Sequence, residues 1–174
     1  LNDWESAMQR SIANSDGLQA LLDLSEGIIG NHISILDPFF KLLAYTKNIK
    51  CDDYVVNELV KQGHHAEETI RKFKLARRFE AWEKSNSVII NESCDVSGYT
   101  TVGKVFKYKN AYSIQVIMVC CHHPFSDGLL DMFNMLLDYV QVYIDRVYTD
   151  QKAFNNLFES FLTDLIENKI EDKA

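Results

Sequence analysis

The chain has 174 residues, of which 47% are hydrophobic and 25% are charged, a composition typical of one folded domain with its own core. Its 18 basic and 25 acidic residues give a formal net charge of −7. This balance argues against a nucleic-acid-binding surface, which needs clustered Lys and Arg. No apolar run approaches the length of a membrane span, and the N-terminus lacks the layout of a signal peptide.

The cysteines indicate the cellular compartment, and the chain ends indicate whether the sequence is a fragment. Cys51, Cys94, Cys120 and Cys121 form no regular disulfide framework, which favours a reducing compartment and hence the cytoplasm. The chain opens on Leu1 rather than Met and stops within a helical pattern. We therefore expect a fragment of a longer cytoplasmic protein.

Residues 1–30 are predicted to form two helices with a packing or dimerisation role. An apolar residue recurs at every fourth position of the first helix, at Trp4, Met8 and Ile12. A wider, leucine-rich stripe covers residues 18–29 and ends at Gly30, a residue type favoured at helix C-caps.

The β-rich core follows, with two helices inserted into it. The predicted elements, in chain order, are strands at 32–36 and 42–46, helices at about 52–62 and 66–85, and strands at 87–91, 99–108 and 112–121. Apolar residues occupy both faces of the last strand, so we expect it to lie in the centre of the sheet.

Strands grouped two and three around inserted helices predict an α+β domain over residues 31–148. Its expected core is an antiparallel sheet of five to six strands flanked by helices, with long helices at both ends of the chain. PAS and GAF sensor domains have this layout.

A long helix is predicted after the sheet. Its pattern begins near Ser126, and no Pro or Gly interrupts it after Gly128. The part over 126–148 has more than one apolar stripe, which indicates either a partner helix or a deeper intramolecular core. Residues 149–174 would continue as a signalling or linker helix.

We expect a homodimer built from the terminal helices, because exposed apolar stripes there would form an unusually large surface patch. The candidate interface residues are Trp4, Met8, Ile12, Phe154, Phe158, Phe161 and Leu165.

No catalytic or metal motif accompanies the reactive residue types. His64–His65 and His122–His123 lack metal-ligand spacing, so a solvated turn and a structural strand end are favoured, with a haem or metal ligand at His64–His65 as the alternative. Cys121 and His122 would face apart in a strand and could not share a proton. We expect no enzyme activity and no cofactor.

An aromatic set lies on the elements that should surround the sheet. Plain core packing explains such a set, and the alternative is that some of these side chains line a cavity for a small-molecule effector. The candidates for ligand binding are Tyr45, Phe73, Phe79, Trp82, Tyr99 and Tyr112.

Several segments together resemble the sensor region of PucR-type bacterial transcription regulators. The first is the leucine-rich Leu21–Leu24, followed by Gly30–Asn31, an apolar strand and the Leu42–Tyr45 run. The further matching pieces are Asp53–Leu59, Val102–Val105, Pro124–Asp127 and the tail Phe158–Ile170. The sequence departs from the pattern at His32, where such regulators usually have Pro.

The resemblance implies a ligand-sensing and dimerising domain whose C-terminal helix relays a signal. In such regulators this helix leads to a cyclase-like domain and a helix-turn-helix, so DNA would be contacted outside this chain. The alternatives are a PAS or GAF sensor module of a kinase or cyclase, a non-catalytic dimerisation domain without a ligand, and a small enzyme on a related α/β scaffold.

Overall fold

The computed structural model describes residues 1–92, 96–108, 111–149, 159–160 and 162–163. The helices and strands are α1 (Asn2–Asn14), α2 (Leu18–Ile29), β1 (His32–Leu36), β2 (Leu42–Tyr45), α3 (Tyr54–Gln62), α4 (Glu67–Leu75), α5 (Arg78–Lys84), β3 (Ile89–Asn91), β4 (Thr101–Tyr108), β5 (Ala111–Val119) and α6 (Asp127–Thr149). The predicted α+β class is confirmed.

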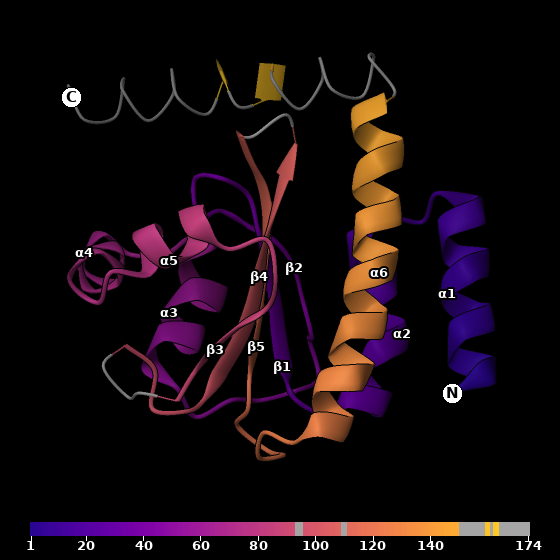
Figure 1. Cartoon of the computed structure of the whole chain (residues 1–174), viewed down its shortest axis with the longest axis horizontal. Coiled ribbons are helices and arrows are strands. Elements are labelled where there is room, and N and C mark those ends of the chain that lie inside the picture. The colour runs from indigo at the N-terminus through magenta and orange to yellow at the C-terminus, as the bar shows by residue number, and fades with distance from the viewer. Residues whose placement is uncertain (93–95, 109–110, 150–158, 161, 164–174) are drawn as a thin grey trace.

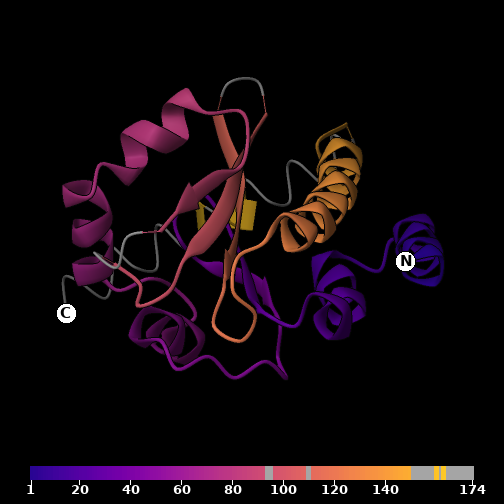
Figure 2. The same cartoon turned by 60° about the horizontal axis from the view of Figure 1, so that its bottom comes forward.

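The strands form one five-stranded sheet in the order β2-β1-β5-β4-β3. Each neighbouring pair is antiparallel, and helices flank the sheet as in PAS and GAF domains. β5 lies in the centre, as its two apolar faces predict. The sheet separates α3, α4 and α5 on one side from α2 and α6 on the other, with α1 outermost (Figures 1 and 2).

The face towards α2 and α6 forms the main hydrophobic core. Ile33 and Ile35 of β1 and Val116 and Met118 of β5 are fully buried there. One apolar stripe of α6 enters the same core, with Phe133, Leu136 and Val140 buried. Alternate side chains of the two strands and one stripe of α6 therefore pack together in one apolar layer.

The N-terminal helix α1 packs on α2 and α6. Trp4 and Met8 are buried in the main core, and the Trp4 indole Nε1 donates a hydrogen bond to Ser25 Oγ over 3.2 Å. Ile12 is partly buried against the same core. This stripe is covered by the chain's own helices, so it does not provide the exposed patch on which our expectation of a dimer seam rested.

Most of the second apolar stripe of α6 also packs within the chain. Met132, Met135 and Tyr139 are partly buried against the main core, and the Tyr139 hydroxyl donates to the Glu5 carbonyl oxygen over 3.4 Å. The intramolecular alternative thus explains these three residues. The candidates Phe154, Phe158, Phe161 and Leu165 lie outside the described residues.

The single helix expected over residues 66–85 is wrong. The structure has two helices, because Arg77 takes a left-handed backbone conformation with φ of 55° and interrupts the helix between α4 and α5. That conformation costs a non-glycine residue about 1 kcal/mol or more, and no Gly, Pro or Asn marks it in the sequence. Within the described part of the chain, no helix combines the length and apolar character that a membrane crossing requires.

Helix α3 begins where the sequence predicts, at an N-cap carboxylate. Asp53 Oδ1 accepts the Val56 amide over 3.1 Å. Its other oxygen, Oδ2, accepts the Ser97 hydroxyl over 2.7 Å and the Gly98 amide over 3.0 Å. Asp53 is buried, so one carboxylate caps α3 and ties the loop at residues 96–98 to it.

We expect Asp53→Asn to lower the free energy of unfolding by about 2 kcal/mol, because an amide NH2 group would face the Gly98 N–H and leave a buried donor unpaired. Urea denaturation measures this loss. The exposed neighbour supplies the control: Asp52→Asn should change stability by less than about 0.5 kcal/mol. Equal effects of the two substitutions would contradict this role for Asp53.

Candidate ligand pocket

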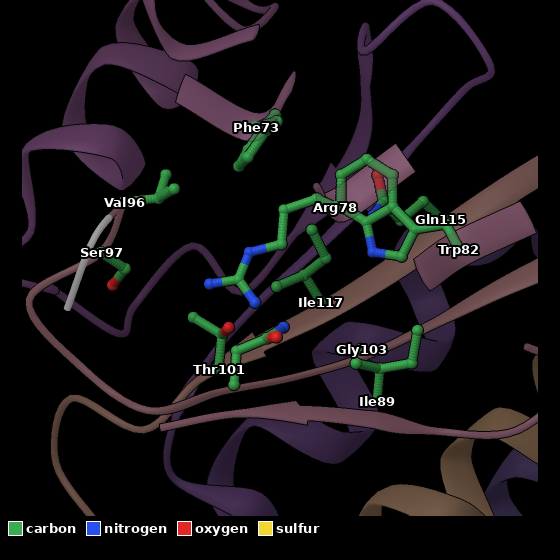
Figure 3. Close-up of a pocket in the computed structure, with 11 residues that line it drawn as sticks. Phe73, Arg78, Trp82, Ile89, Val96, Ser97, Thr101, Gly103, Gln115 and Ile117 are labelled. Carbon is green, nitrogen blue, oxygen red and sulfur yellow. The ribbon is translucent and has the colours of Figure 1, made fainter. Parts of the chain in front are cut away.

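A pocket lies between the sheet and the helices α4 and α5, on the face opposite the main core (Figure 3). We name it the sheet pocket; its cavity volume is about 50 Å³. The side chains that matter below are Phe73 from α4, Arg78 and Trp82 from α5, Asn91 from β3, Thr101 from β4 and Gln115 from β5.

A second hollow adjoins the sheet pocket, and we name it the side pocket. Its cavity volume is about 80 Å³, and Phe40, Phe79 and Val105 contribute to its lining. Trp82 and Gln115 line both hollows. These two side chains therefore lie on the boundary between the sheet pocket and the side pocket.

A cluster of aromatic rings builds the wall that α4 and α5 present. The Trp82 ring meets Phe73 edge-on at a centroid distance of 5.4 Å and Phe79 at 5.3 Å. Phe40 joins them with its centroid 5.7 Å from that of Phe79. Edge-to-face pairs of this kind are favourable beyond their buried area, so the wall is held together by its own packing.

The break at Arg77 sets the direction of α5. Arg78 and Trp82 lie four residues apart, hence on one face of this helix, and both line the sheet pocket. Figure 3 shows the Arg78 side chain extending from α5 with its guanidinium toward Thr101. A continuous helix over residues 66–85 would not have given these side chains the same direction.

Gln115 is the polar group that apolar packing does not explain. It lies on the central strand and is only 6% exposed. No hydrogen bond joins its side-chain amide to another residue of the described part of the chain. The amide atoms are not among the fully buried side-chain atoms without a partner in the described residues, so they face the two hollows, where water can pair with them.

Some of the predicted ligand-binding residues line the two pockets. Phe73 and Trp82 line the sheet pocket, and Phe79 lines the side pocket with Trp82. Tyr45 lines neither of these two hollows, because it lies on β2 with its ring 6.3 Å from that of His32. Tyr99 packs in a separate cluster with Cys51, Val56 and Val119.

The side chain of Tyr112 lies outside the described part of the structure. Sequence reasoning missed Arg78 and Gln115. A signal existed for Gln115, which is a polar residue in an otherwise apolar stretch of a strand predicted to be central. Arg78 offered no comparable signal, because its direction depends on the helix break at Arg77.

The adjacent histidines diverge. His64 is exposed, and His65 is buried against the rings of Phe40 and Phe73 at centroid distances of 6.1 and 5.1 Å. The His122 ring nitrogen Nε2 lies 2.6 Å from the Lys50 carbonyl oxygen. In the described part of the chain, no three His, Cys, Asp or Glu side chains come together as a candidate metal site.

Three buried groups are held in their neutral form. Burial lowers the pKa of His65 to about 4, with a smaller effect from His64, and burial lowers the pKa of His32 to about 4. Burial also raises the pKa of the Cys120 thiol to about 11. These shifts follow from the cost of placing charge in an apolar interior.

The fold and pocket define the class of this protein as an α+β domain with a PAS/GAF-like antiparallel sheet, hollowed on one face and covered by a long C-terminal helix on the other. No protein-family model matches the sequence, and no curated protein matches it.

The low pKa of His65 predicts a loss of stability in acid. The folded-state pKa lies near 4 and the unfolded value near 6.5, so the unfolded state takes up more protons between these values and stability falls as the pH drops through 6.5. At pH 5 the cost is about 2 kcal/mol for this residue.

We expect His65→Leu to reduce the difference in unfolding free energy between pH 7 and pH 5 by about 2 kcal/mol, measured by urea denaturation. The control His64→Leu, at an exposed position, should change the pH dependence much less, because the charge of His64 is the smaller cause of the low pKa of His65. An unchanged pH dependence in His65→Leu would show that this ring is not the acid-sensitive group.

Proposed function

We propose that the chain is the ligand-sensing and dimerising regulatory domain of a PucR-like transcription regulator. A small molecule occupies the sheet pocket, and the signal leaves through α6 and the residues that follow it. DNA is contacted by another part of the longer regulator. The domain itself is non-catalytic and works in the cytoplasm, where thiols such as Cys51, Cys120 and Cys121 stay reduced.

The observation that carries this proposal is the position of β5. Gln115 and Ile117 line the sheet pocket, whereas Val116 and Met118 are fully buried in the core that includes α6. A ligand that displaces β5 on one face must therefore repack the other face. Such coupling needs a ligand with different affinities for two arrangements of the sheet and α6.

The lining of the pocket favours binding over chemistry. Among the described residues that line the two hollows, none is a His or Cys. The Ser97 hydroxyl donates to Asp53, which is already the N-cap of α3. Nucleophilic catalysis needs a nucleophile beside a free general base, so we assign these polar groups to binding and to loop structure.

The regulator assignment draws on the order and spacing of the sequence segments that resemble PucR-type sensors. The position of α6 supports this assignment, because α6 covers one face of the sheet and continues to Thr149. A sensor from a kinase or cyclase would use the same pocket and helix. The residues that follow this chain in the full protein distinguish these assignments.

We expect a small molecule to remain bound when the protein is purified under native conditions and analysed by mass spectrometry. Ile117→Phe should reduce its occupancy at least about tenfold, because the larger ring fills the sheet pocket. Ile90→Phe is the matched control, at an exposed position on the edge strand β3, and should keep the molecule.

If the unmodified protein carries no small molecule and a metabolite library leaves its melting temperature unchanged, the sensing role fails. The domain would then be better described as a dimerisation module without a ligand.

We expect the chain to form a homodimer through the C-terminal segment. Phe158→Glu combined with Phe161→Glu should yield monomers in light scattering, since like charges would be brought together at the two-fold axis. Ser160→Glu with Thr163→Glu adds the same charge at exposed positions and should stay dimeric. An unmodified chain that is monomeric at high micromolar concentration would contradict this arrangement.

A further inference from the structure

We infer that Cys51 and Cys121 form a site of reversible oxidation, at which a hydroperoxide such as hydrogen peroxide converts the two thiols into an intramolecular disulfide. The bond joins the segment that precedes α3 to the segment that follows the central strand β5. This inference goes beyond the proposed function, because it does not depend on the sheet pocket holding a ligand.

The two cysteines belong to one small apolar cluster. Cys51 is buried there with Val56 of α3 and Val119 of β5, and Cys121 packs against these side chains. Burial raises the pKa of the Cys51 thiol above its usual range, and the interaction with the Cys121 thiol raises it further. The fold therefore brings two free thiols from distant parts of the sequence next to each other.

The alternation of side chains along β5 selects Cys121 rather than Cys120 for this pair. Successive side chains of an extended chain point to opposite faces of a sheet. Cys120 is buried with Met118 in the main core, whereas Cys121 packs with Val119 in the cluster of Cys51. The sheet therefore lies between Cys120 and Cys51, and only Cys121 is on the correct face.

Hydrogen bonds hold the two backbone segments together. The His122 ring nitrogen Nε2 lies 2.6 Å from the Lys50 carbonyl oxygen, so the residue after Cys121 contacts the residue before Cys51. Asn31 Oδ1 accepts the His122 amide over 2.9 Å, which fixes the same segment to the start of β1. Disulfides form only where the two backbones are close, and these contacts hold the segments that carry the pair side by side.

The two thiols differ in access, and this difference sets the order of the reaction. Cys121 is partly exposed, whereas Cys51 is only 6% exposed. The carboxylates of Asp52 and Asp53 also disfavour the Cys51 thiolate, in addition to burial. Because the thiolate is the form that attacks a peroxide, Cys121 reacts first and Cys51 reacts second.

The chemistry takes two steps. The Cys121 thiolate sulfur attacks one peroxide oxygen, the O–O bond breaks, and the hydroxide that leaves takes up the proton that Cys121 released. Cys121 is thereby oxidised to a sulfenic acid. The Cys51 sulfur then attacks the sulfenic sulfur, the S–O bond breaks, and the oxygen leaves with the Cys51 proton as water. Two thiols and one hydrogen peroxide thus give one disulfide and two water molecules.

This pair fits a cytoplasmic protein. Thiols there stay reduced under ordinary conditions, and disulfides that do form are usually transient and redox-sensing. The bond would fix the start of α3 to the end of β5 when peroxide is present. Oxidation is then a second input to the same central strand that borders the sheet pocket.

Mass spectrometry of the whole 174-residue chain tests the pair. The reduced protein is treated with hydrogen peroxide at low protein concentration, remaining thiols are blocked with N-ethylmaleimide in denaturant, and tryptic peptides are analysed without reduction. We expect the peptide that begins at Cys51 to be linked to the peptide that contains Cys121, with fragment ions placing the bond at Cys121. The oxidised protein should also melt several degrees higher, because the disulfide closes a long loop.

The other cysteines supply matched controls. Cys51→Ser and Cys121→Ser should each abolish the linked peptides, whereas Cys120→Ser should retain them because Cys120 lies on the opposite face. Cys94 lies outside the described residues, so Cys94→Ser tests it as a competing partner and should also retain the link. Urea denaturation checks that each variant folds.

The peptides of the unmodified protein decide the inference even if a variant fails to fold. The pair is wrong if N-ethylmaleimide still blocks Cys51 completely after peroxide treatment, or if Cys121 is oxidised to a sulfinic acid while Cys51 stays a thiol. A link that Cys94→Ser or Cys120→Ser abolishes as fully as Cys121→Ser, or one that joins two chains, overturns it as well. The sensing role is decided separately, by the native mass spectrum.

Discussion

The central strand β5 pairs with a strand along each edge and packs against a helical layer on each face. The arrangement of the other elements follows from these four contacts. β1 and β4 take up its backbone hydrogen bonds along both edges. One face carries fully buried apolar side chains against the helical layer of α2 and α6. The other face is open enough to leave two hollows under α4 and α5. A sheet packed equally on both faces would have stability but no room for a ligand.

Local signals in the sequence predicted most of the fold. Gly30 and Gly63 end helices in left-handed conformations, as their positions after apolar stripes indicate, and Asp53 caps α3. The apolar residues on both faces of β5 predicted its central position. The break at Arg77 could not be predicted, because Arg has no preference for a left-handed backbone; tertiary packing of the aromatic rings must compensate for the local cost. Helix existence was thus easier to predict than helix continuity.

The pocket was only partly predictable for a related reason. Aromatic residues can be recognised one by one, but a hollow forms where side chains from α4, α5, β3, β4 and β5 fail to fill space together. Phe73, Phe79 and Trp82 reached the two hollows because they lie on helices over the open face. Trp4 and Met8 show the reverse case: their stripe suggested an exposed seam, yet the neighbouring helices α2 and α6 cover it, which sequence periodicity alone does not reveal.

Gly103 lies at the floor of the sheet pocket, where β4 pairs with β5 and β3. A Cβ atom there would approach the Val116 carbonyl oxygen to 3.3 Å and the Ile117 side chain to 3.5 Å. Any larger residue at this position both crowds the sheet and makes the hollow shallower. The depth of this hollow and the packing of the strands beneath it are therefore set by the same residue, and neither can be changed at this position without the other.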